Sequence, residues 1–195
     1  MVASLRPIET KYKGYRFRSR LEARWAVCFD TLGVKWEYEQ EGYELGEAGK
    51  YLPDFWLPEH ESWVEIKGHH ENEDEQQRAR LLHVATTFPV YIFSGEFDIP
   101  LRGWYTGTDS TDSNGGFGDF GGIWAYCPIC SAISLKPFAW EESRGFYKSD
   151  WEPVASPCIH TGLELWRRGC LHSPYIRKAV DAARSARFEF GETGR

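Results

Sequence analysis

Hydrophobic and polar residues follow two different periods in the first hundred residues of the chain. Between Ser19 and Gly33, apolar residues recur every three or four positions, which is the spacing of one buried helix face. Ser19 is a favourable N-cap and Gly33 a favourable C-terminal stop, so we predict a helix between them. Residues 12–17, just before it, predict a short extended or hairpin segment.

After this helix the period changes to two. Residues 34–39, 42–45, 50–57 and 62–68 alternate between polar and apolar side chains, which predicts a meander of about four strands. Residues 71–88 begin with acidic side chains and end with an apolar face, as a helix does, and residues 89–96 form an apolar strand. This order of elements predicts an α/β fold, in which helices pack on a mixed sheet.

Residues 107–122 interrupt the pattern, because Gly, Ser, Thr and Asp dominate them. We therefore predict a core over residues 1–106, a linker over 107–122, and a smaller module over 123–195 that ends in a helix capped by Ser173. The linker contains a formal GxGxxG at Gly116, Gly118 and Gly121, but no strand–turn–helix context surrounds it, so we reject a dinucleotide site.

Composition and charge narrow the class of protein. A chain of 195 residues with 42% apolar and 16% aromatic residues can bury a core, which argues against disorder. The sequence shows no signal peptide and no stretch long enough to span a membrane, so we expect a cytoplasmic protein without a membrane partner. The net charge is −6, yet both ends of the chain are locally basic and could form a phosphate-binding patch.

Three charged residues lie in the predicted strand pair over residues 50–68. Glu65 and Lys67 share one strand face, while Val64 and Ile66 point to the other. A tight return would bring Asp54 beside Glu65, and two neighbouring carboxylates repel each other unless a cation lies between them. A hard divalent ion such as Mg²⁺ would resolve that conflict. The alternative is a surface hairpin with cross-strand ion pairs, which contribute only about 0–1 kcal/mol.

The order Pro53-Asp54 and then Glu65-Ile66-Lys67 resembles the motif of the PD-(D/E)xK nuclease superfamily. The phrases FRSRLEARWA, YLPDFWL and WVEIKG are similar to its phage-type and resolvase-like branch, and the resemblance covers about residues 12–95. It implies a restriction-endonuclease-like core, with a central mixed sheet flanked by helices. It also implies that a helix before the motif donates a further Glu, which is Glu22 here.

The resemblance implies a role for each of these positions. Asp54 and Glu65 would bind Mg²⁺ or Mn²⁺ with the Ile66 carbonyl, and Glu22 would assist. Lys67 would orient or deprotonate the attacking water, or neutralise charge at the phosphate. Ser19-x-x-Glu22 is also a capping box, so the role of Glu22 is open between helix cap and metal site.

Basic residues surround the first predicted helix, and we single out Arg18 and Arg20 as candidates for contact with DNA. The final helix also carries basic residues among alanines, which fits either a DNA-contacting helix or an ordinary surface helix.

The cysteines indicate a second type of metal site. Cys127 and Cys130 have the two-residue spacer of a zinc knuckle. Cys158 and Cys170 are the simplest completion of a structural Zn²⁺ site, with His160 or His172 as alternative ligands; the other interpretation is buried free thiols.

The sequence thus predicts a Mg²⁺-dependent DNA endonuclease with a zinc-stabilised C-terminal module. The alternative is a zinc-containing nucleic-acid-binding protein whose nuclease-like core is inactive. DNA, in duplex, branched or nicked form, is the expected partner, and the sequence allows a homodimer.

Overall fold

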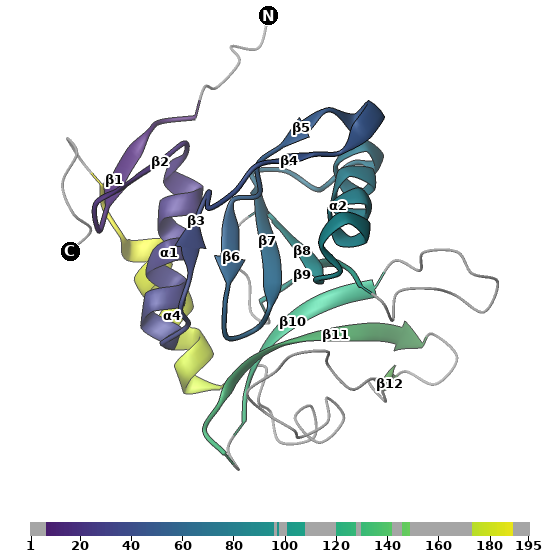
Figure 1. Ribbon diagram of the computed structural model, residues 1–195. Coiled ribbons are helices and arrows are strands. Elements are labelled where there is room, and N and C mark those ends of the chain that lie inside the picture. Colours follow the sequence, from purple (N-terminus) through teal and green to yellow (C-terminus); the bar gives the residue numbers. More distant parts are fainter. Residues whose placement is uncertain are drawn as a thin grey trace, which may run out of the picture.

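A computed structural model describes residues 7–95, 97, 101–107, 120–127, 130–141, 146–148 and 173–188 (Figure 1). The helices in these ranges are α1 (Arg20–Leu32), α2 (Glu73–Thr86), α4 (Pro174–Ser185) and the short 3-10 helix η1 (Gly46–Ala48). The strands are β1 (Thr10–Tyr12), β2 (Tyr15–Phe17), β3 (Glu37–Tyr38), β4 (Tyr43–Glu44), β5 (Lys50–Tyr51), β6 (Phe55–Leu57), β7 (Ser62–Lys67), β8 (Val90–Ser94), β9 (Arg102–Thr106), β10 (Phe120–Tyr126), β11 (Ile133–Glu141) and β12 (Phe146–Lys148).

Eight of these strands form one sheet, in the order β12-β11-β10-β9-β8-β7-β6-β3. The pair β7 and β8 is parallel, and the other neighbouring strands are antiparallel, so the sheet is mixed. The hairpins β1–β2 and β4–β5 are separate two-stranded sheets. The prediction of an α/β fold with helices on a mixed sheet is therefore confirmed.

The helices cover both faces of the sheet. Figure 1 shows α1 and α4 side by side, with α2 apart from them against the other face. Val64 and Ile66 of β7 pack in the cluster that contains α1 and α4, whereas Trp63 of the same strand packs in the cluster of α2. The alternation of side chains along one strand thus supplies both layers of the core.

Capping residues fix the beginnings of the helices. The Ser19 hydroxyl accepts a hydrogen bond of 3.1 Å from the Glu22 amide, and Gly33 ends α1 at φ 75°, as predicted. Ser173 caps α4 in the same way, with Pro174 at its first position. No helix in these described ranges is long and apolar enough to cross a membrane.

The segment over residues 50–57, predicted as one strand, is two strands instead. Pro53 separates β5 from β6, because proline lacks the amide hydrogen that a continuous ladder needs. As a result β5 pairs with β4, and β6 begins directly after Asp54. Further along the chain, β10 pairs with β9 across the predicted linker, of which residues 108–119 lie outside the described residues.

Candidate active site

The hairpin of β6 and β7 brings Asp54 and Glu65 together. The two strands are antiparallel, and Phe55 lies opposite Val64, so the residues just beyond this pair, Asp54 and Glu65, lie opposite each other. Both carboxyl side chains are buried: Asp54 is 4% exposed and Glu65 2% exposed. The two carboxylate residues of the sequence motif are therefore neighbours in a setting shielded from solvent.

Two donors hold the Asp54 carboxylate in place. Its Oδ2 accepts a hydrogen bond of 2.8 Å from the backbone amide of Ile66, and its Oδ1 accepts one of 3.0 Å from Arg18 Nη2. Arg18 also pairs with Glu39, at 2.5 Å from Nε to Oε1. Arg18, which the sequence suggested for DNA contact, thus reaches the candidate site itself.

Lys67 lies on the same face of β7 as Glu65 and makes an ion pair with it. The distance from Lys67 Nζ to Glu65 Oε2 is 2.9 Å. Burial works against the ammonium ion, but the charges of Glu65, Asp54 and Glu75 outweigh it and raise the pKa of Lys67. Lys67 is therefore positively charged at neutral pH in this arrangement.

Negative charge at the site exceeds what these cations balance. Burial, followed by the charges of Glu65 and Glu22, raises the pKa of Asp54 well above its ordinary value. The Ile66 amide and the Lys67 ammonium act in the opposite direction without cancelling this effect. Such an arrangement favours either a proton on Asp54 or a further cation beside it.

Glu22 combines the capping position with a place near the site. Its Oε1 accepts a hydrogen bond of 2.7 Å from the Ser19 hydroxyl, and its Oε2 accepts one of 2.6 Å from the Tyr38 hydroxyl. The backbone amide of Arg18 donates a third, at 3.1 Å to Oε2. The side chain thus folds back to the start of α1, as a capping residue does. In a capping box its carboxylate would accept from the backbone amide of Ser19, whereas here it accepts from the backbone amide of Arg18.

Two tyrosines near these carboxylates were not singled out from the sequence. Tyr38 bonds to Glu22, and burial together with that bond raises the pKa of its hydroxyl. The pKa of Tyr51 is raised too, by burial first and then by the charges of Glu65 and Asp54. Tyr51 lies three residues before Asp54 in the sequence.

The residues present fit a divalent cation by the chemistry of their donors. Asp54 and Glu65 supply two buried carboxylates, and Oε1 of Glu65 has no hydrogen-bond partner. Within the described ranges, no three His, Cys, Asp or Glu side chains gather closely enough to hold one metal ion. Glu22 stays apart because its own three hydrogen bonds hold it at the start of α1.

The predicted zinc knuckle lies at the turn between β10 and β11. The amide of Ser131 donates a hydrogen bond of 2.7 Å to the Cys127 carbonyl, and the amide of Cys127 donates one of 2.8 Å to Ala132. Cys127 is buried and Cys130 is exposed. The remaining proposed ligands, Cys158, Cys170, His160 and His172, lie outside the described residues.

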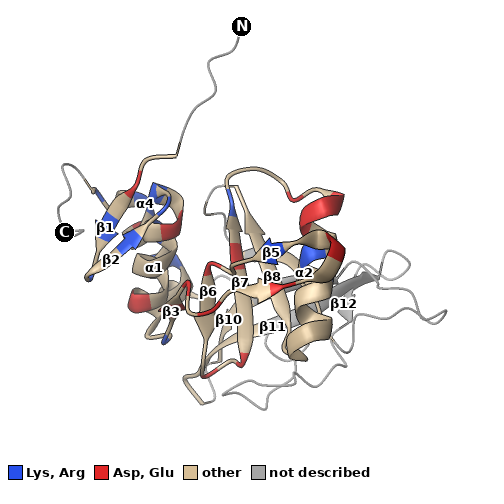
Figure 2. Cartoon of the chain, turned by 45° about the horizontal axis from the view of Figure 1, so that its top comes forward, with Lys and Arg blue, Asp and Glu red and all other residues tan. Residues whose placement is uncertain are grey.

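The two arginines proposed for DNA contact lie in different places. Arg18 reaches Asp54, whereas Arg20 lines a pocket between α1 and the end of α4. In Figure 2, β1 and β2 beside these helices contain Lys and Arg residues, while the N-terminal turn of α2 is acidic. Among the described residues, basic side chains thus gather on other elements than the acidic turn of α2.

Comparisons with models of known protein families, with curated proteins and with solved structures found no match. The functional inference therefore depends on the site itself.

Proposed function

We propose that the protein is a Mg²⁺-dependent DNA endonuclease that hydrolyses phosphodiester bonds. One observation carries the proposal: Asp54 and Glu65 lie buried beside each other, with the Lys67 ammonium 2.9 Å from Glu65. Burying two carboxylates together is unfavourable for folding alone, because each raises the free energy of the other's charged form. The order of these residues also resembles the PD-(D/E)xK motif.

In this proposal Asp54 and Glu65 hold the metal ion, with the backbone carbonyl of Ile66. When bound, a divalent cation supplies Lewis-acid activation of water and stabilises charge that develops on the phosphate. The Ile66 amide and Arg18 fix the orientation of Asp54, so that the carboxylate need not reorganise during the reaction.

Lys67 has the charge and position to stabilise the reaction's anionic transition state. Because the surrounding carboxylates keep it protonated, we assign it charge neutralisation and orientation of the attacking water in preference to proton abstraction. Glu22 has a positioning role: it holds the start of α1, from which Arg18 extends to Asp54.

A cleavage panel tests the proposal. Linear, branched, nicked and single-stranded DNA are incubated with the full chain in Mg²⁺ or EDTA. We expect cutting only with Mg²⁺, and a loss of at least a hundredfold in Glu65→Gln and Lys67→Ala. Glu44→Gln and Lys50→Ala are the matched controls, because both residues are exposed on the β4–β5 hairpin.

Two results would contradict the assignment. Equal cutting by the wild type and both site variants would place the activity elsewhere. Binding of DNA without cutting of any substrate would favour the alternative, a zinc-containing nucleic-acid-binding protein with an inactive core.

A further inference from the structure

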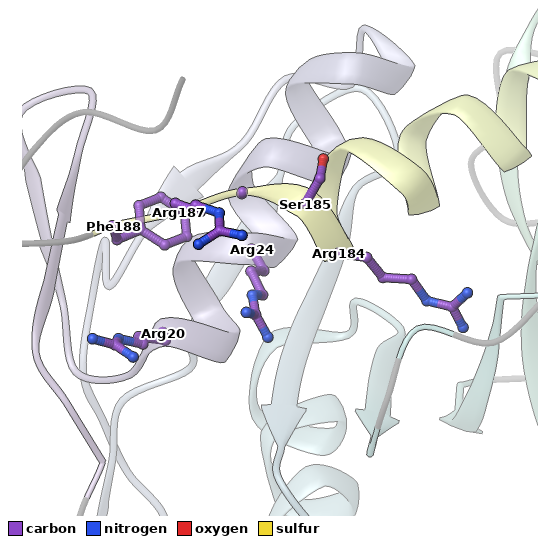
Figure 3. Close-up of a pocket in the computed structure, with 7 residues that line it drawn as sticks. Arg20, Arg24, Arg184, Ser185, Arg187 and Phe188 are labelled. Carbon is purple, nitrogen blue, oxygen red and sulfur yellow. The ribbon is translucent and has the colours of Figure 1, made fainter.

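A pocket of about 380 Å³ lies between α1 and the C-terminal end of α4 (Figure 3), and no residue of the β6–β7 hairpin lines it. It is lined by Arg20, Arg24, Arg184, Ser185, Ala186, Arg187 and Phe188. Four of these seven residues are arginines and none carries a carboxylate. A protein of net charge −6 thus concentrates positive charge at one pocket.

Helix geometry explains how the arginines gather there. Arg20 and Arg24 are four residues apart, so they share one side of α1, whereas Glu22 between them points to a different side. Small residues let α4 approach α1 closely: Ala23, Ala26, Ala179 and Ala183 are all fully buried. The end of α4 therefore brings Arg187 to the side of α1 that carries Arg20 and Arg24 (Figure 3).

The individual side chains suit an anion. Arg20 and Arg187 are exposed, and Arg24 has a buried Nε that lacks a hydrogen-bond partner. Arg184 donates to the backbone carbonyl of Phe97, which fixes it at the rim of the pocket. A buried Phe188 closes one wall.

We infer that this pocket binds a backbone phosphate of a nucleic acid at some distance from the cleavage site. Guanidinium groups match phosphate oxygens through paired, charge-assisted hydrogen bonds, and those of Arg20, Arg24 and Arg187 around one pocket suit the singly charged backbone phosphate. The inference rests on the proposed function for its choice of ligand. Helix α1 links the two places, since Glu22 and the arginines lie on different sides of the same helix.

The test measures binding without cleavage. Fluorescence anisotropy of a labelled DNA oligonucleotide is recorded in EDTA at several salt concentrations, with the full chain and with Arg20→Gln/Arg187→Gln. Both residues are exposed, so the double variant should fold, and circular dichroism checks this. We expect binding about tenfold weaker at low salt and a salt slope smaller by about 1, as loss of one phosphate contact predicts.

The matched control is Arg177→Gln/Lys178→Gln, which removes the same charge from exposed positions of α4 outside the pocket. Equal weakening in both double variants would reduce the effect to general electrostatics and overturn the inference. Unchanged DNA binding by Arg20→Gln/Arg187→Gln would also overturn the inference. This holds even if inorganic phosphate binds the wild type and does not bind this variant. If the pocket variant alone loses DNA binding while the wild type cuts no substrate, the phosphate site stands and the endonuclease proposal fails.

Discussion

Replacing Glu22 or Glu65 by Gln removes one buried negative charge in each case, yet the structure predicts a loss of stability for Glu22→Gln and little change for Glu65→Gln. The Glu22 carboxylate accepts hydrogen bonds from the Ser19 hydroxyl, the Tyr38 hydroxyl and the Arg18 amide. Glu65 has one ion pair, to Lys67, and its Oε1 has no hydrogen-bond partner.

The magnitude follows from the bonds to Glu22. A hydrogen bond to a charged group contributes about 1.5–3 kcal/mol and a neutral one about 0.5–1.5 kcal/mol. In Glu22→Gln, the two hydrogen bonds to Oε2 change from bonds to a charged group into neutral ones. We therefore expect the free energy of unfolding to fall by about 2 kcal/mol and Tm by about 4–8 °C. In Glu65→Gln the lost ion pair is offset by relief of repulsion with Asp54, so the free energy of unfolding in EDTA should stay within about 1 kcal/mol of the wild type.

Thermal unfolding followed by circular dichroism, in EDTA and in Mg²⁺, separates the two roles. A ligand that binds the folded state raises Tm by mass action. We expect Mg²⁺ to raise the Tm of the wild type and of Glu22→Gln, but not that of Glu65→Gln. A larger loss of stability in Glu65→Gln than in Glu22→Gln would refute the reasoning from hydrogen bonds. Loss of the Mg²⁺ effect in Glu22→Gln would instead make Glu22 a metal ligand.

Three further predictions follow from individual contacts. Tyr38→Phe removes the 2.6 Å hydrogen bond to Glu22, and urea unfolding should show a loss of about 1.5–3 kcal/mol; an unchanged midpoint would contradict it. Gly103→Ala would place a Cβ atom against the Ile92 carbonyl oxygen, which forces β8 and β9 apart. Calorimetry should therefore show a loss of about 1–3 kcal/mol in the free energy of unfolding, and wild-type stability would disprove the close approach. The pKa of Asp54 is higher in the folded than in the unfolded protein, where it is about 4. Its contribution to the free energy of unfolding is therefore complete below about pH 4 and is lost as the pH rises through the pKa of the folded state. The excess stability of the wild type over Asp54→Asn in EDTA should therefore fall from pH 4 to pH 8, and a constant difference would contradict this sign.

The helices were predictable from the sequence because their signals are local. Ser19 and Gly33 bound the first helix, and the structure has α1 between them, at Arg20–Leu32. For the second helix, the acidic start at residues 71–75 indicated an N-terminus, and Asn72 forms a capping box with Glu75. Both signals act within one helical turn, so no knowledge of distant residues is needed.

Strand pairing was less predictable, since it depends on residues that are far apart in the chain. The break at Pro53 moves Tyr51 into the small β4–β5 sheet and leaves Asp54 directly before β6. The partners of Asp54 come from β7 and from Arg18, thirty-six residues upstream. Alternation in the sequence indicated that Glu65 and Lys67 share a strand face. It did not indicate that Arg18 would reach the Asp54 carboxylate.

The cost of the charged cluster is itself an argument for function. A protein selected only for stability would gain by replacing a buried ion pair with apolar side chains of similar size, which is often neutral or stabilising. Here Asp54 and Glu65 are both almost fully buried, on strands whose other faces carry Phe55, Val64 and Ile66 in the core. The sheet therefore already has the apolar contacts it needs, and the carboxylates add an electrostatic cost that a bound cation would offset. Active sites often hold buried charged groups that lower stability, and the buried pair of Asp54 and Glu65 is therefore the physical reason to expect chemistry at this hairpin.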